Sequence, residues 1–148
     1  MAFKEDYATL SLPPYDELNA EFDLSAVADD CARPAKEVAK KIFERVDGFK
    51  KILESLLQPE SVIEMEEAGK LTEKQQQEIA AVIQSLMRID RELLVAELEN
   101  TDEAYVHFVN TAWAAWPSVK EKLQPIVQLL RDNWSVQKKL KITHHYLG

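Results

Sequence analysis

The stretch LTEKQQQEIAAVIQSLMRIDRELLVAELEN, residues 71–100, decides the fold because its pattern is that of one long amphipathic helix. Thr72 followed by Gln75 is a capping-box pattern, in which two side chains satisfy free N–H groups at the helix start. The apolar residues beyond that start recur at three- and four-residue spacings and are predicted to share one side: Ile79, Val82, Ile83, Leu86, Ile89, Leu93 and Leu94. Such a stripe is protected from water only when other helices pack on it.

Much of the rest of the chain shows the same helical periodicity. Residues 34–58 begin with a proline suited to a first helical turn and carry a seam of apolar residues at steps of three and four. Residues 60–69, 101–116 and 118–140 predict further helices, with Pro117 as a break and Pro125 as a kink or a second break. No segment requires a strand, so we predict an all-α helical bundle of about four long helices plus short ones.

Residues 1–13 lack a helical period, and Pro13 and Pro14 favour an extended backbone. We therefore expect an extended N-terminal arm over residues 1–13 and a single helical-bundle domain over residues 14–148. The apolar residues Phe3, Tyr7 and Leu10 of this arm are candidates for contact with a groove of the bundle or with a second subunit.

The composition excludes several classes of site. The chain has three glycines, Gly48, Gly69 and Gly148, whereas a P-loop or a dinucleotide fingerprint needs several glycines at fixed short spacing. The single cysteine, Cys31, cannot form an internal disulfide, and the N-terminal residues do not resemble a secretory signal. No apolar run approaches the roughly 20 residues needed to span a bilayer. We expect a cytoplasmic protein without a membrane span.

The net charge is −8, and it is unevenly distributed. Residues 1–30 carry eight acidic groups and one basic group, whereas residues 31–58 carry four acidic and seven basic groups. Residues 59–103 are again strongly acidic, and residues 131–148 are basic. An acidic protein repels phosphates, which argues against a nucleic-acid partner. We expect the acidic and basic helices to lie side by side.

One acidic pattern resembles a metal site. Glu64 and Glu67 match the Glu-x-x-Glu spacing, and Glu99 and Asp102 the Glu-x-x-Asp spacing, with which all-α nucleoside-triphosphate pyrophosphatases hold Mg²⁺. The resemblance covers only these two spacings, and Gly69 interrupts the first motif, which is longer in that family. A Mg²⁺-dependent nucleotide pyrophosphohydrolase is therefore an alternative interpretation.

The aromatic residues, the apolar arm and the separated charge blocks are the features that suggest binding to a protein. Trp113, Trp116 and Trp134 come from the C-terminal helices, and tryptophan is prominent at binding hot spots, although the spacing of Trp113 and Trp116 also fits a core position. Together with Phe3, Tyr7 and Leu10 they are the predicted partner-binding residues. We predict a non-enzymatic protein-protein interaction or self-association module, a homo-oligomer or a binder of another protein, that needs no cofactor. A helical bundle that binds a small ligand near Trp113 and Trp134 is the second alternative.

Overall fold

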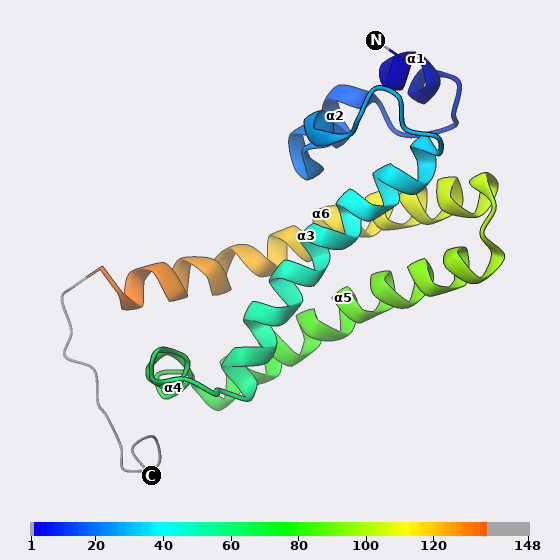
Figure 1. The fold of residues 1–148 in the computed structure, drawn as a ribbon. Helices are drawn as coiled ribbons and strands as arrows, with labels where there is room; N and C mark the ends of the chain where they lie inside the picture. The colour runs from blue at the N-terminus through cyan, green and yellow to red at the C-terminus, as the bar shows by residue number, and fades with distance from the viewer. Residues whose placement is uncertain (1, 136–148) are drawn as a thin grey trace.

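The computed structural model describes residues 2–135, which form six α-helices and a short 3₁₀ turn without a β-strand (Figure 1). The all-α class is thus confirmed. The elements are α1 (Ala2–Ala8), α2 (Tyr15–Phe22), η1 (Leu24–Ala26), α3 (Pro34–Leu57), α4 (Val62–Ala68), α5 (Glu73–Glu99) and α6 (Asp102–Asn133). The long helices α3, α5 and α6 all pack on one another, α1 and α2 lie near the end at which α3 begins, and α4 lies at the opposite end (Figure 1).

Helix α5 forms as predicted, and its two ends fix the direction of the chain. The Thr72 N–H donates to Gln75 Oε1 at 2.9 Å and the Gln75 N–H donates to Thr72 Oγ1 at 3.1 Å, so the capping box is complete. At the other end Asn100 adopts a left-handed conformation with φ 55°, and the hydroxyl of Thr101 then accepts the Ala104 N–H that starts α6. Helices α5 and α6 therefore form a tight antiparallel hairpin (Figure 1).

The predicted stripe of α5 is buried except at its end. Ile79, Val82, Leu86, Ile89 and Leu93 belong to the core, and Ile83 is half-buried. The placement of Leu94 on this stripe is wrong, because half of this residue, 51%, is exposed. Consecutive positions of a helix lie about 100° apart, and the core lies on the side of Leu93, so Leu94 points away from it.

Helix α6 runs without a break through Pro117 and Pro125, so the two helices predicted for residues 101–116 and 118–140 are one over the described residues. The described chain has three long helices rather than about four for this reason. Each proline removes one backbone N–H donor. Both prolines are exposed, so the carbonyls they leave unpaired, those of residues 113 and 121, lie on the side that water reaches. Burial of Trp116, Val119 and Leu123 on the other side holds the helix together.

The extended arm predicted for residues 1–13 is also wrong over its first part. Ala2–Ala8 form α1, on which Phe3 and Tyr7 are one turn apart and both buried. Their rings pack edge-on against Tyr15 of α2, with centroids 6.2 and 5.4 Å from it. The Tyr7 hydroxyl donates to the Pro13 carbonyl, and burial, followed by the nearby Tyr15, raises the pKa of Tyr7 to about 12. Two aromatic anchors therefore stabilise a helix that is too short to form alone.

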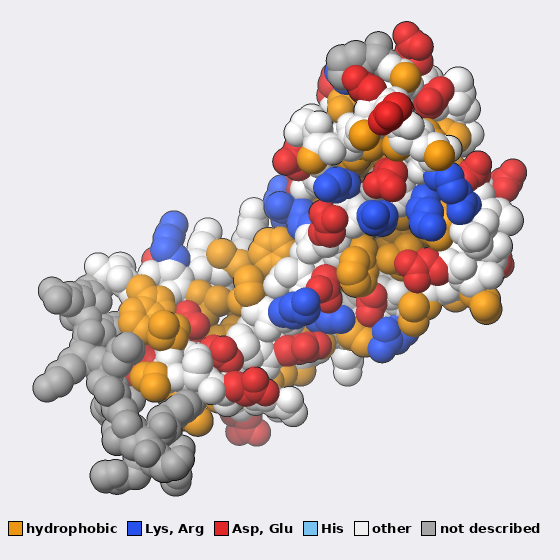
Figure 2. Space-filling model, viewed as in Figure 1, with side chains coloured by type: hydrophobic (Ala, Val, Ile, Leu, Met, Phe, Trp, Pro, Cys, Tyr) orange, Lys and Arg blue, Asp and Glu red, His pale blue; other side chains and the backbone are white. Residues whose placement is uncertain are grey.

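Basic and acidic side chains alternate on the surface, as expected for charge blocks that lie side by side. On the face shown in Figure 2, Lys and Arg side chains lie among Asp and Glu side chains. Lys50 of α3 lies 3.6 Å from Asp90 of α5, and Arg33 just before α3 lies 3.4 Å from Asp102 of α6. These pairs join helices that are far apart in the sequence.

Replacing Gly48 by alanine is expected to raise the free energy of unfolding by about 1 kcal/mol. Gly48 lies inside α3, is exposed, and has no atom within 4 Å of the position that a Cβ would occupy. The alanine would thus relieve the entropic cost of glycine in a helix without a clash. Urea denaturation measures the change. Gly69→Ala is the control and should give no gain, because its Cβ would lie 3.1 Å from the Met65 carbonyl.

Candidate functional site

The structure does not bring the predicted partner-binding residues together on one surface. Phe3, Tyr7 and Trp116 are buried, and Leu10 and Trp113 are half-buried. Trp134 is 38% exposed at the end of α6, where its indole N–H donates to Glu67 of α4 at 3.0 Å. It follows Trp113 by 21 positions, or roughly 31 Å along a helix, so the two rings do not line one pocket.

Trp116 belongs to an aromatic cluster that joins α2 to α6. Its ring lies 5.2 Å from that of Phe22 and 6.3 Å from that of Phe49. Its indole N–H donates to Glu21 Oε2 at 2.9 Å, while Lys120 Nζ donates to Glu21 Oε1 at 2.7 Å. These hydrogen bonds, from Lys120 first and then Trp116, lower the pKa of Glu21 below its usual value. Every polar group of the cluster has a partner within it, which indicates a structural role.

The four acidic residues of the predicted Mg²⁺ site are also far apart. Glu64 and Glu67 lie on α4, before α5 begins, whereas Glu99 and Asp102 lie where α5 ends and α6 begins. Helix α5 has 27 residues and so separates the two pairs by roughly 40 Å. Within residues 2–135 no group of three or more His, Cys, Asp or Glu side chains is placed to hold a metal ion.

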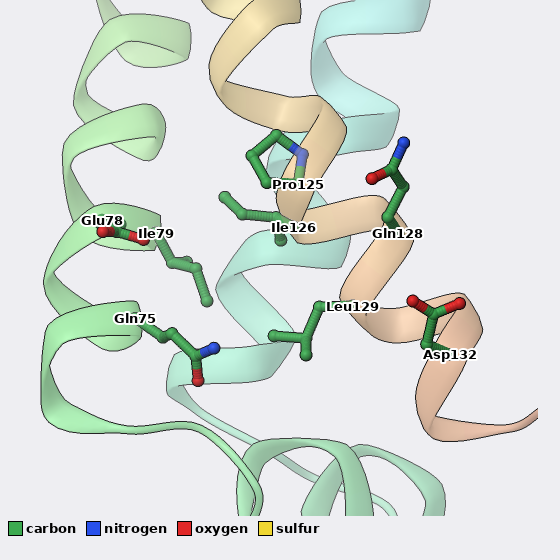
Figure 3. Close-up of a pocket in the computed structure, with 8 residues that line it drawn as sticks. All are labelled: Gln75, Glu78, Ile79, Pro125, Ile126, Gln128, Leu129 and Asp132. Carbon is green, nitrogen blue, oxygen red and sulfur yellow. The ribbon is translucent and has the colours of Figure 1, made fainter.

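A groove lies between the start of α5 and the end of α6 (Figure 3). Ile79, Ile126 and Leu129 form its floor, and polar side chains such as Gln75 and Asp132 surround them. Its volume of about 260 Å³ is just below the roughly 300–1,000 Å³ of typical small-molecule pockets. The groove is open, and its lining shows no convergent set of charged groups that would select a ligand.

The most exposed large apolar side chain of the described residues lies on the outside of α5, near its C-terminal end, beside two others that are also exposed. Leu98 is 88% exposed, and Leu94 and Val95 are each more than half exposed. All three occur within five residues, on the side of α5 that faces away from the core. We call this region, together with its neighbours on the same side, the α5 outer surface, made up of Met87, Arg88, Arg91, Leu94, Val95 and Leu98.

Toward the middle of the helix, the side chains of the α5 outer surface leave a shallow, open space between them, which we call the hollow. The hollow is lined by side chains of this helix alone: Ile83, Gln84, Met87, Arg88, Arg91 and Glu92. Met87 and Ile83 are half-buried at its base. Arg91 lines the end of the hollow nearer to Leu94 and Leu98, and it forms an ion pair with the adjacent Asp90 at 2.9 Å. The surface thus combines a protruding apolar side chain with a hollow about two to four turns away.

Sequence reasoning missed Val95 and Leu98, although a signal was present. Leu94 and Leu98 are four residues apart and so form one row, and Val95 lies beside it. This second apolar row is interrupted by Glu92, Glu97 and Glu99, which belong to other sides of the helix. A separate test for a second stripe, displaced from the core stripe, would have found it.

Comparison of the chain with known protein families, with curated proteins and with solved structures found no match. Over the described residues, no helix combines the length and the apolar character needed to cross a membrane. A function for this chain therefore has to be inferred from its own side chains.

Proposed function

We propose that this protein is a non-enzymatic protein-interaction module that docks on another protein chain through the α5 outer surface. The observation that carries the proposal is the exposure of Leu98, at 88%, next to Leu94 and Val95. Burial of apolar surface contributes about 25 cal/mol for each Å², so covering three such side chains favours association. The single free thiol, Cys31, suits the cytoplasm, which is the compartment we propose.

The helix that carries this surface is preorganised for binding. Both ends of α5 are capped, and its inner side is anchored in the core by Leu86, Ile89 and Leu93. A docking surface on a rigid helix loses little conformational entropy when a partner binds. Leu98 follows Val95 by three positions and Leu94 by four, and these are the spacings with which one helix contacts another.

The proposal is tested by placing a photo-reactive benzoylphenylalanine at position 98 and irradiating cells that express the protein. We expect a covalent adduct with protein at this position. Gln77 is the matched control, because it is exposed on the same helix roughly 31 Å away and should give no adduct. Leu94→Asp in the same chain should abolish the adduct. Equal adducts at both positions, or none at either, would overturn the proposal.

A further inference from the structure

We infer that the partner on the α5 outer surface is a second copy of this chain, with the two α5 helices antiparallel and related by a twofold axis near Leu94. The inference rests on the proposed function and names its partner. Two features of the surface lead to it independently: the position of the hollow relative to Leu98, and the position of Arg88 relative to Glu99. The charge pair sets the position of the axis, and the position of the hollow is compatible with it.

The first feature is a protrusion and a hollow on one helix. When two identical helices pair antiparallel, position i of one lies opposite position 2c − i of the other, where c is the residue at the axis. The hollow spans residues 83–92, with its middle near residue 88, and the protruding side chain is Leu98. Leu98 of each copy thus reaches the hollow of the other, beside Met87 and Arg91, when c is about 93.

The second feature is a pair of opposite charges. Arg88 and Glu99 are 11 residues apart, close to three full turns, so they lie on the same side of the apolar row. In an antiparallel pair, residues on the same side of the row face each other across the interface. Arg88 of one copy meets Glu99 of the other, twice, when the axis lies between residues 93 and 94. The same axis places Glu97 opposite Asp90, whose carboxylate is already paired with Lys50 and Arg91 within each copy. Within residues 2–135 neither Arg88 nor Glu99 has an ion-pair partner of its own.

The hollow and the charge pair are compatible with one position of the twofold axis, which favours a second copy over an unrelated protein as the partner. Leu94, which is half exposed, then lies next to its own symmetry mate at the axis. The interface is isologous, because each Leu98 lies against the hollow of the other copy and each Arg88 has an acceptor there. Both copies therefore use the same surface. An unrelated partner would require neither the spacing of Arg88 and Glu99 nor that of Leu98 and the hollow.

Charge reversal tests the arrangement through mixing, measured by sedimentation equilibrium over a range of protein concentrations. Arg88→Glu alone and Glu99→Arg alone each place like charges across the axis, and we expect each to weaken the dimer at least tenfold. An equimolar mixture of the two variants again places opposite charges at both contacts and should restore dimers, as should the double variant. Lys122→Glu makes the same change of charge on α6 and is the control, which should dimerise like the wild type.

Engineered cysteines test the direction of the helices. In a Cys31→Ser background, Leu94→Cys should oxidise to a covalent dimer, because the two positions meet at the axis. Met87→Cys should not, because an antiparallel partner places its own residue 87 roughly 20 Å away. A disulfide at residue 87 would show a parallel pair and overturn the inference.

The outcomes separate the inference from the proposed function. A wild-type protein that stays monomeric, or dimers unaffected by either charge variant, would overturn the antiparallel dimer. A position-98 adduct containing a different protein would then leave the proposed function standing with another partner. A wild-type protein that forms neither a dimer nor a position-98 adduct would contradict both the antiparallel dimer and the proposed function.

Discussion

Replacing Phe3 by alanine is expected to lower the free energy of unfolding by about 3 kcal/mol. Phe3 is 2% exposed, and its ring contacts those of Tyr7 and Tyr15, so the alanine leaves a cavity where α1 meets α2. The loss would show that residues 2–8 are part of the core rather than a detachable arm. Chemical denaturation followed by circular dichroism measures the change.

Two comparisons make this prediction specific. Asp6→Ala alters an exposed side chain of the same helix and should change the free energy of unfolding by less than about 0.5 kcal/mol. Tyr7→Phe keeps the ring but removes the hydroxyl that donates to the Pro13 carbonyl, and should cost about 1 kcal/mol. If Phe3→Ala were no more harmful than Asp6→Ala, α1 would not be packed on the bundle.

The sequence predicts the helices whose signals are long and local. Residues 71–100 carry a start signal and an apolar stripe over about four turns, and α5 has the start signal and most of the stripe. The early part of the chain has only two aromatic residues one turn apart, which is too little for a periodicity argument. Helix α1 is stabilised by packing on Tyr15, which lies outside the helix in α2, and the periodicity of residues 2–8 does not encode that contact.

The continuity of α6 through its prolines and the exposure of the candidate site were not predicted, for a related reason. A proline costs a helix about 3 kcal/mol by itself, so Pro117 and Pro125 predict breaks. Packing of Trp116 and its neighbours on two other helices outweighs that cost, which cannot be judged from α6 alone. Leu94 was assigned to the core because a wide apolar stripe hides the boundary between two faces. Which face a partner helix covers is decided by the tertiary structure.

Replacing Glu21 by glutamine is expected to lower the free energy of unfolding at pH 7 by about 2 kcal/mol. The carboxylate accepts hydrogen bonds from Trp116 and Lys120, and each hydrogen bond to a charged group contributes roughly 1.5–3 kcal/mol when well shielded. Glu21 and Lys120 are partly exposed, so the combined contribution of the two hydrogen bonds falls toward the lower end of that range. The amide of glutamine keeps one acceptor but loses the charge.

The same variant predicts a pH dependence with a definite sign. The pKa of Glu21 is lower in the folded chain than its usual 4.5, so the folded state favours the ionised carboxylate. The stability that Glu21 contributes is fully present above about pH 4.5 and is lost as the pH falls through the lower folded value. Wild type and Glu21→Gln should therefore differ most near pH 7 and converge in acid. Denaturation curves recorded from pH 7 to pH 3 measure the difference, and two parallel stability profiles would show that the charge of Glu21 does not hold α2 on α6.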